Sequence, residues 1–323
     1  MSNPSSIQPK NNIKQNSFIG GRHPLVTVVI PTYNRVDLVQ QAIASVISQT
    51  YTNWELIIVD DGSDDGTSDA IIAMNDIRIK VLKMRHFGNI ALLRNIGVKG
   101  GTGEWLAFLD SDDIWIPRKL EIQLFFLLQE GKRWGYGGSE LMNKDMCTIP
   151  NKAGKYRPIS GWIVKDVLAT EASVNIGTLM LERTLFEEVG GFDKDAELLY
   201  REDYELVIRL ALKSEALAIP ELLLRVREHE GRATNAFEYG NDRTAAVYEH
   251  FIRTHPKKQL VKIASRRMAS ELAESAIIRI KKKEYLQAAR RLGKALINGD
   301  NWWHLLSAIS RGFTTSSPQR MSS

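Results

Sequence analysis

The stretch LIIVDDGS at residues 56–63 decides the fold of this chain. In it, an apolar run ends abruptly in two carboxylates, a glycine and a serine. The stretch WLAFLDSDD at residues 105–113 repeats the pattern. In each we expect a buried parallel strand that brings acidic side chains to its carboxyl end, where open α/β sheets bind their ligands. Because clustered carboxylates are costly unless a cation or hydrogen-bond donors offset them, both stretches predict a divalent-metal nucleotide site.

Strand and helix signals alternate from residue 25 to about residue 130, which favours a parallel sheet wrapped by helices on both faces. The first part is expected to hold strands at 26–30, 56–59, 79–82 and 105–109, and helices at 36–48, 67–74, 90–98 and 117–129. Glycines at 135, 137, 138, 154 and 161 predict loops within a mixed sheet. The later part is expected to hold a strand at 174–181 that is broken at Gly177, a strand at 222–226, and helices at 184–189, 203–213, 260–280 and 285–297.

The composition is that of a globular protein: 43% of the 323 residues are hydrophobic and 25% are charged. One cysteine, Cys147, excludes an intramolecular disulfide framework and a cysteine-rich zinc site. Apolar runs stay short of the ~20 residues that span a bilayer, and the amino terminus lacks the apolar core of a signal peptide. These features predict a cytoplasmic protein.

Five motifs, in order, resemble those of family 2 glycosyltransferases, which are inverting enzymes of the GT-A fold that use nucleotide-sugars. The motifs are VVIPTYNR at 28–35, DDGS at 60–63, RNIG at 94–97, DSD at 110–112 and the pair Glu202-Asp203. A short acidic triplet alone is weak evidence, whereas five motifs in order are strong evidence. The resemblance covers about residues 24–230. It implies an α/β GT-A domain at 23–238, with a helical basic appendage at 239–313 and disordered tails at 1–22 and 314–323.

Asp110 and Asp112 stand two residues apart at a strand end, so in an extended segment their side chains share one face. Mg²⁺ and Mn²⁺ take oxygen ligands and bridge carboxylates to phosphates. The resemblance makes Asp112 the direct ligand of Mn²⁺ or Mg²⁺, while Asp110 contacts the ribose or shares the ion. The alternative is that these acidic residues cap the helix that follows, a task that also suits Asp113.

The nucleotide base and ribose are expected beside Pro31, Thr32 and Tyr33, because the resemblance places them there and Tyr33 offers a ring for stacking. Asp60 carries fixed lone pairs that accept a hydrogen bond from N3–H of uracil or thymine. Asp61 and Ser63 either take part in the site or only shape the turn. These residues predict a UDP- or dTDP-sugar as the donor.

Three basic side chains are candidates for contact with the diphosphate. Arg94 is expected to bind it or to brace Asp60. Arg35 is expected either to face the phosphates or to lie at the periphery. His229 stands where many relatives have an Arg-x-His segment that closes over the diphosphate, but the residues after it depart from the relatives' pattern. Metal ligation, phosphate binding and a plain surface position all stay open for His229.

Glu202 and Asp203 begin an amphipathic helix. The resemblance makes Asp203 the general base that deprotonates the acceptor hydroxyl, with Glu202 orienting the acceptor. A carboxylate is ionised at neutral pH and can take that proton as the hydroxyl attacks. The alternative is that both negative charges only stabilise the amino end of the helix through its dipole.

The charge is unevenly distributed along the chain. Residues 251–323 hold 15 Lys and Arg against 4 Asp and Glu, whereas the rest holds 28 against 34. The basic tail, with Trp302 and Trp303, is either a solvated helical surface or a contact with the inner face of the membrane. Nucleic acid is not an expected partner.

The sequence therefore predicts a metal-dependent inverting glycosyltransferase for polysaccharide or glycoconjugate synthesis, with a saccharide or lipid-linked acceptor. A sugar nucleotidyltransferase would have a glycine-rich loop with Arg and Lys where this chain has residues 31–35. In an aspartyl phosphatase, Thr or Val is expected soon after the acidic triplet, whereas this chain has Ile114 there. A non-catalytic nucleotide-sugar-binding or scaffold protein is the remaining alternative, although no motif carboxylate is missing.

Overall fold

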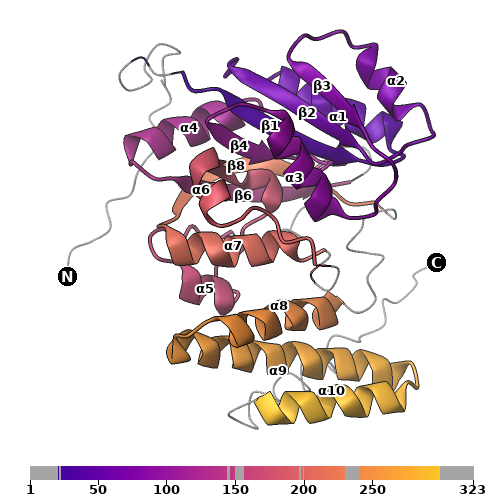
Figure 1. Ribbon diagram of the computed structural model, residues 1–323, viewed down its shortest axis with the longest axis vertical. Helices are drawn as coiled ribbons and strands as arrows, with labels where there is room; N and C mark the ends of the chain where they lie inside the picture. Colours follow the sequence, from indigo (N-terminus) through magenta and orange to yellow (C-terminus); the bar gives the residue numbers. More distant parts are fainter. Residues whose placement is uncertain are drawn as a thin grey trace.

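The computed structural model describes residues 21, 23–143, 146–149, 156–195, 198, 200–229 and 240–298, which form a mixed eight-stranded sheet with flanking helices (Figure 1). The strands are β1 (Val26–Thr32), β2 (Trp54–Asp60), β3 (Ile79–Lys83), β4 (Trp105–Phe108), β5 (Ile114–Trp115), β6 (Trp134–Met142), β7 (Met180–Glu182) and β8 (Leu217–Arg227). The helices are α1 (Val36–Ile47), α2 (Thr67–Ile72), α3 (Ile90–Gly100), α4 (Lys119–Gln129), α5 (Val164–Leu168), α6 (Arg183–Glu188), α7 (Glu202–Lys213), α8 (Gly240–Thr254), α9 (Lys258–Lys281) and α10 (Tyr285–Asn298), with a 3-10 turn η2 (Ile176–Thr178).

The sheet has the order β3-β2-β1-β4-β7-β6-β8-β5. Its first four strands are parallel, and β7 then pairs antiparallel with both β4 and β6. In the register of β1 with β2, Thr32 lies opposite Asp60, so both strands end at the same edge. The loops after β1, β2 and β4 therefore meet there, as the alternating sequence pattern predicts for a parallel α/β half.

Each face of the sheet has its own apolar core, because successive side chains of a strand point to opposite faces. Val28 and Ile30 of β1 belong to a cluster with apolar residues of α1 and α4. Val29 belongs to the other cluster, which contains Phe108 of β4 and residues of α3, α6, α7, α8 and α9. Helices therefore cover both faces, and the C-terminal helices share the second core.

The glycines between residues 135 and 138 lie inside a strand, so the expectation of loops there was wrong. β6 is the neighbour of β8, and its glycines permit a close approach. A Cβ on Gly137 would lie 2.3 Å from Leu223 Cδ1, and one on Gly135 would lie 2.7 Å from the Leu217 oxygen. Glycine in this strand thus serves packing rather than a turn.

Two further expectations were wrong in detail. The helix expected from Pro117 begins at Lys119, and Ile114–Trp115 form the edge strand β5 beside β8. The strand expected at 174–181 was predicted to break at Gly177, and Gly177 lies in the turn η2; the strand itself, β7, begins only after that turn. Asn175 begins this turn, because its Oδ1 accepts a hydrogen bond from the Gly177 N–H at 2.9 Å.

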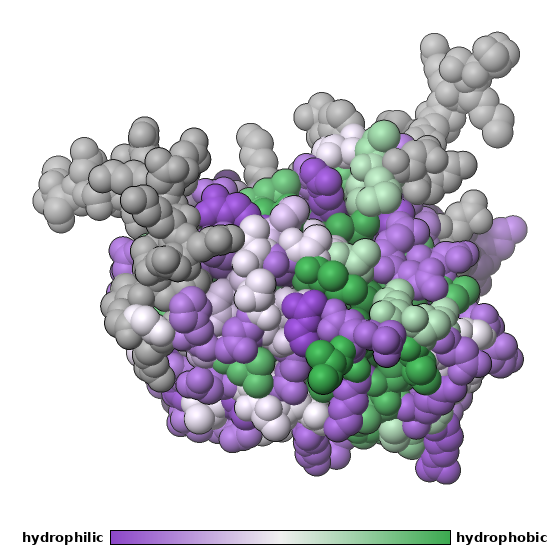
Figure 2. All heavy atoms as spheres, turned by 90° about the horizontal axis from the view of Figure 1, so that it is seen from above, coloured by the Kyte–Doolittle hydropathy of each residue, from purple (hydrophilic) through white to green (hydrophobic). Residues whose placement is uncertain are grey.

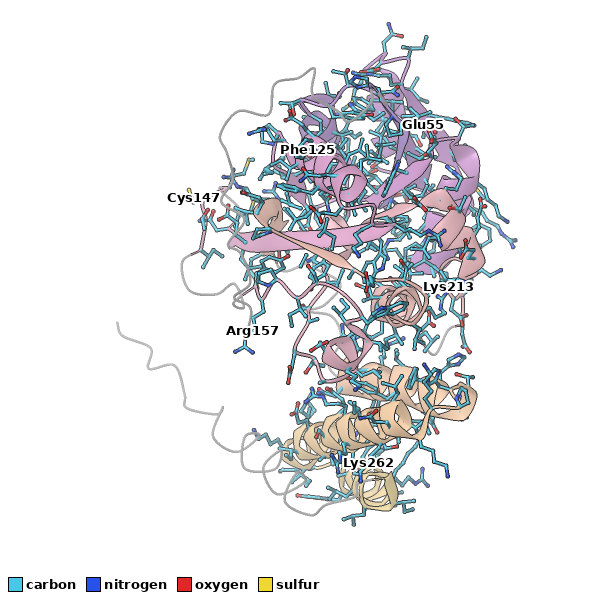
Figure 3. All side chains as sticks on the ribbon, turned by 90° about the vertical axis from the view of Figure 1, so that its left-hand side faces the viewer. Glu55, Phe125, Cys147, Arg157, Lys213 and Lys262 are labelled. Atoms are coloured by element: carbon cyan, nitrogen blue, oxygen red, sulfur yellow. The ribbon has the colours of Figure 1, made fainter. Side chains whose placement is uncertain are left out.

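Helices α8, α9 and α10 lie in layers beyond α7 and α5, on the side away from the sheet (Figure 1). Figure 3 shows the same layering, with Lys213 at the end of α7 and Lys262 on α9. The Tyr248 hydroxyl of α8 lies 2.8 Å from the Tyr204 hydroxyl of α7. It also donates to the Leu168 carbonyl of α5 at 3.2 Å. The boundary near residue 238 stays a prediction, but α8 and α9 are packed into the core.

Figure 2 views the opposite, sheet end of the molecule from above and shows hydrophobic patches interrupted by hydrophilic residues. Within the described part of the chain, no helix is long and apolar enough to cross a membrane. The two predicted tails and the pair Trp302 and Trp303 lie outside the described residues.

Candidate active site

A cavity of about 710 Å³ lies at the edge where β1 and β4 end. One wall comes from the loops after these strands, 31–35 and 110–113. Further lining comes from residues 167–176 and from the start of α7. Ligands of α/β proteins bind at this edge of the sheet, so the cavity is the candidate active site.

Asp61 borders this cavity, and two backbone N–H groups hold its carboxylate. The Phe87 N–H donates to Oδ1 at 2.8 Å and the Gly88 N–H donates to Oδ2 at 2.9 Å. His86 Nδ1 lies 3.0 Å from the same Oδ2, and the His86 ring stacks on Tyr33 with centroids 4.1 Å apart. A flat ring surface and a fixed acceptor carboxylate thus lie side by side, next to the predicted base-binding residues Pro31 and Thr32.

Asp60, in contrast, does not border the cavity. Its Oδ1 accepts hydrogen bonds from the Ser63 N–H at 3.0 Å and from the Ser63 hydroxyl at 2.5 Å. Its Oδ2 accepts from the Ser68 hydroxyl, and the side chain is buried. Asp60 therefore shapes the turn, and Asp61 has the position that we expected for Asp60. Two adjacent residues at a strand end point to different sides, which the sequence alone did not resolve.

Arg94 lies beneath the cavity floor, buried between the two acidic motifs. One guanidinium nitrogen is 2.7 Å from Asp110 Oδ1 and another is 2.6 Å from Glu202 Oε1. Burial lowers the pKa of Arg94, but Asp110, Glu202 and Asp203 together outweigh burial and raise it above its ordinary value. Arg94 thus joins the end of β4 to the start of α7, and neither diphosphate contact nor bracing of Asp60 fits its place.

The side chain of Asp112 turns to another set of partners. Its Oδ2 lies 2.7 Å from Arg35 NH1 and 3.0 Å from His229 Nε2. The two carboxylates of the DSD motif therefore separate, since Asp110 pairs with Arg94. Arg35 lines the cavity, and His229 follows the last residue of β8. The structure thus joins three predicted site residues that are far apart in sequence.

A divalent cation fits this arrangement. A carboxylate oxygen and an imidazole nitrogen that converge within 3.0 Å are ligand types that Mn²⁺ accepts, and carboxylates suit Mg²⁺. The described residues contain no group of three or more His, Cys, Asp and Glu placed to hold a metal. An ion held here would have to take its other ligands from phosphate oxygens of the substrate or from water.

Asp113 and Arg227 connect the 110–113 loop to β8. The Arg227 N–H donates to Asp113 Oδ1 at 3.0 Å, and Arg227 Nε donates to the Asp112 carbonyl at 3.1 Å. Arg227 also reaches Gln41 of α1 at 2.8 Å. Because α4 begins only at Lys119, the alternative of helix capping by the acidic residues was wrong.

Asp203 borders the cavity at the first turn of α7, while Glu202 is buried in its pair with Arg94. Burial raises the pKa of both carboxyls, and the charge of Arg94 opposes this rise in both. Asp203 is therefore a carboxylate of raised basicity that faces the cavity, as a general base requires. Glu202 is positioned to support α7 rather than to touch an acceptor.

Several cavity residues were not predicted from the sequence: Asp61 in this role, His86, Asn175, Tyr200, Arg201, Thr244 and Glu271. His86 and Asn175 do not belong to any recognisable motif. Thr244 and Glu271 belong to helices whose periodic sequence indicates only packing. No signal in the sequence connects these positions to the strand ends.

The family described as Glycosyl transferase family 2 matches residues 27–141. The glucosyltransferase WfgD of Escherichia coli, named for transfer from UDP-Glc to alpha-D-GlcNAc-diphosphoundecaprenol, is 33% identical over 195 residues, which are 60% of this chain and 73% of WfgD. The chain belongs to glycosyltransferase family 2. It is therefore a glycosyltransferase, and the predicted family and enzyme class are confirmed.

Two solved structures share the fold. Staphylococcus aureus TarS 1-349 in complex with UDP-GlcNAc has a TM-score of 0.62 at 14% identity, over 91% of this chain and 93% of that one. Mannosyltransferase PcManGT of Pyrobaculum calidifontis, in complex with GDP-Man and Mn²⁺, has a TM-score of 0.61 at 19% identity, over 92% and 82%. The predicted GT-A fold with C-terminal helices is confirmed.

Proposed function

We propose that this glycosyltransferase is a metal-dependent inverting enzyme that transfers a sugar from a UDP- or dTDP-sugar to a hydroxyl of a saccharide or lipid-linked acceptor. One observation carries the proposal: Asp112, after β4, and Asp203, at the start of α7, border the same cavity. A carboxylate for a cation and a basic carboxylate are thus available in one space. A reacting anomeric carbon between them would have a departing diphosphate on one side and an attacking hydroxyl on the other.

The donor base belongs at the end of the cavity near Asp61 and Tyr33. A stacked ring face receives a planar base, and a carboxylate accepts its N3–H. Oδ1 of Asp61 accepts a hydrogen bond from the Phe87 N–H and has a second lone pair for the base, whereas Oδ2 accepts from the Gly88 N–H and also lies 3.0 Å from His86 Nδ1. These features support a uracil or thymine base and do not distinguish between the two.

The diphosphate belongs near Asp112, Arg35 and His229. Asp112 and His229 would hold Mn²⁺ or Mg²⁺, and Arg35 would contact a phosphate oxygen. The bound ion supplies charge stabilisation to the departing diphosphate. Asp110 is tied to Arg94 and faces the ribose side of the loop. The Mn²⁺ found with PcManGT is consistent with this assignment.

Asp203 acts as the general base. It takes the proton of the acceptor hydroxyl while the hydroxyl oxygen forms a bond to the anomeric carbon. The bond between that carbon and the diphosphate oxygen breaks, and its electron pair leaves with the nucleoside diphosphate. Because attack comes from the side opposite the leaving group, the configuration inverts. The raised pKa of Asp203 makes it a stronger proton acceptor than an exposed aspartate.

The place of action is proposed to be the inner face of the cytoplasmic membrane, in polysaccharide or glycoconjugate synthesis. WfgD is named for a lipid-linked acceptor. Helix α10 exposes an apolar stripe that includes Tyr285, Leu286 and Ile297, which are 64%, 65% and 85% exposed. Residues 281–297 hold six Lys and Arg against one Glu. An apolar stripe beside basic side chains fits an anionic lipid surface.

A panel of nucleotide-sugars tests the donor half of the proposal. Thermal shift with Mn²⁺, with Mg²⁺ and with a chelator should select UDP- or dTDP-sugars only when metal is present. A ligand at about 100 times its dissociation constant adds about 2.7 kcal/mol to the stability, which such a scan detects. Transfer to saccharide and lipid-linked acceptors then follows with the selected donors. Equal binding and transfer under chelator would refute metal dependence.

A further inference from the structure

The cavity continues past Asp203 to residues of the C-terminal helices. Thr244 of α8 and Glu271 of α9 both line it, together with Tyr200 and Arg201 just before α7. Thr244 and Glu271 stand more than a hundred residues beyond the family match at 27–141. Apart from His229, the residues proposed to bind the nucleotide and the metal all precede Asp203 in sequence. The proposed function assigns none of these four residues to the donor.

Arg201 connects the base to this end of the cavity. Its Nε donates a hydrogen bond to Thr244 Oγ1 at 2.8 Å. Its positive charge acts on two carboxyls, because it opposes the burial that raises the pKa of Asp203 and also that of Glu271. Arg201, Asp203 and Glu271 all line the cavity.

Glu271 is held in place by a neighbouring amide. Asn241 Nδ2 donates to Glu271 Oε2 at 2.8 Å and to Glu274 Oε2 at 3.1 Å. Two carboxylates thus share one amide, but only Glu271 lines the cavity. Arg267 NH2 also lies 3.5 Å from Glu271 Oε1, and a carboxylate with these donors keeps further lone pairs for hydroxyl groups. Burial raises the pKa of Glu271, while Asn241, Arg267 and Arg201 oppose that rise.

Tyr200 adds an aromatic surface. Its φ of +68° is in the left-handed region, which a bulky residue rarely adopts and which often marks a functional site. The Arg243 guanidinium lies 5.4 Å from the ring centroid. A ring with this fixed neighbour offers one apolar surface to the cavity. A binding site for a pyranose ring needs two features: an aromatic face that contacts the C–H groups of the ring, and charged side chains that bind its hydroxyl groups.

We propose that Tyr200, Arg201, Thr244 and Glu271 form the subsite for the acceptor saccharide, and this inference rests on the proposed function. The apolar C–H face of the sugar ring lies on Tyr200. Hydroxyl groups of the sugar donate to Glu271 and accept from Arg201. The attacking hydroxyl then points to Asp203. The C-terminal helices thus determine which acceptor is used, and they do not touch the donor.

The test compares two neighbouring carboxylates. Glu271→Gln removes the charge that faces the cavity, and Glu274→Gln removes the charge that shares the same amide but does not line the cavity. Thr244→Val serves as a second variant of equal volume. Each full-length variant is assayed with UDP-glucose and a panel of acceptors, namely alkyl-linked α-GlcNAc-diphosphate and simple p-nitrophenyl glycosides. The readouts are KM for the acceptor, KM for the donor and the affinity for UDP with Mn²⁺.

Glu271→Gln should raise the acceptor KM about 10- to 100-fold, the loss of one hydrogen bond to a charged group. Its donor KM and UDP affinity should stay at the wild-type values, and Thr244→Val should raise the acceptor KM in the same direction. Glu274→Gln should match the wild type in every readout. An unchanged acceptor KM in Glu271→Gln, or equal losses in both glutamate variants, would overturn the acceptor subsite while leaving the glycosyltransferase intact. Absence of transfer by the wild type to every acceptor would count against the proposed function itself.

Discussion

Replacing Arg94 with methionine should lower stability and shift the pH dependence of transfer. The side chain is 3% exposed and contacts Asp110 and Glu202 at 2.7 and 2.6 Å. Methionine fills a similar volume but leaves two carboxylates without their cation. Breaking a buried pair by removing one partner costs about 3–5 kcal/mol. We expect the free energy of unfolding of Arg94→Met to fall by this amount near neutral pH.

The pH dependence of the loss follows from protonation. Burial already holds the pKa of Glu202 above its ordinary value, and Arg94 opposes that rise. Without Arg94 the folded-state pKa rises further, so the folded protein binds protons that the unfolded chain has released. Stability therefore falls as pH increases from the unfolded pKa through the raised folded pKa. The Arg94→Met protein should be less damaged at about pH 5 than at about pH 8.

The pH dependence of transfer should also shift to higher pH in Arg94→Met. Arg94 also lowers the pKa of Asp203, so its removal raises that pKa. A general base must be deprotonated, and the acid limb of kcat/KM should then move to higher pH in the variant. Urea unfolding at about pH 5 and about pH 8, with a pH–rate profile, measures both effects.

Arg183→Met is the matched control. Arg183 is partly buried, and it donates to the Gly103 and Val98 carbonyls at 2.7 and 2.9 Å rather than to carboxylates. Its loss should cost stability by a similar amount at both pH values and leave the acid limb in place. If Arg94→Met loses equal stability at both pH values and keeps the wild-type acid limb, the assignment of Arg94 as the counter-charge of α7 is refuted.

Four further predictions address the site and the surface. Asp203→Asn should keep UDP affinity but lose transfer about 10²- to 10⁴-fold in a steady-state assay, and near-normal turnover would place the base elsewhere. Asp112→Ala should abolish Mn²⁺-dependent UDP binding in calorimetry without lowering the melting temperature, whereas wild-type affinity would exclude Asp112 as a ligand. Asp61→Asn should weaken UDP binding about tenfold with little loss of stability, while Asp60→Asn should chiefly lower stability; the reverse pattern would restore Asp60 as the base contact. Leu286→Glu should reduce sedimentation with anionic vesicles at low salt, and equal sedimentation of variant and wild type would remove α10 from the lipid surface.

The local pattern of the chain was enough to predict the parallel half of the sheet. Short apolar runs that end in DDGS and DSD become β2 and β4, and their ends meet at one edge as expected. Alternating strand and helix signals are local, because each element is read from the spacing of its own apolar residues. The local pattern gave the wrong prediction at β6. Its glycines permit the close approach of β8 and do not form a turn.

The motifs identify the acidic residues of the site but do not predict which partner each of them contacts. The sequence places Asp60 and Asp61 together, and also Asp110 and Asp112, but gives no partner to any of them. The fold sends Asp60 into a turn with Ser63 and Ser68, and it sends Asp110 to Arg94. Asp60 and Asp61 are neighbours in an extended chain, so their side chains point to opposite sides. Asp110 and Asp112 lie in a turn, in which the Asp113 N–H donates to the Asp110 carbonyl at 3.1 Å, so their side chains do not share the face that an extended segment would give them.

The sequence by itself determined the family, the order of the motifs and the carboxylates available for chemistry, since these depend only on residue type and spacing. Tertiary structure alone decided that Arg94 links β4 to α7, that His229 meets Asp112, and that Glu271 of α9 reaches the same cavity as Asp203. Each of these contacts joins segments separated by many residues. Their distances depend on how helices and strands pack around the two cores, and no local pattern in the chain encodes that packing.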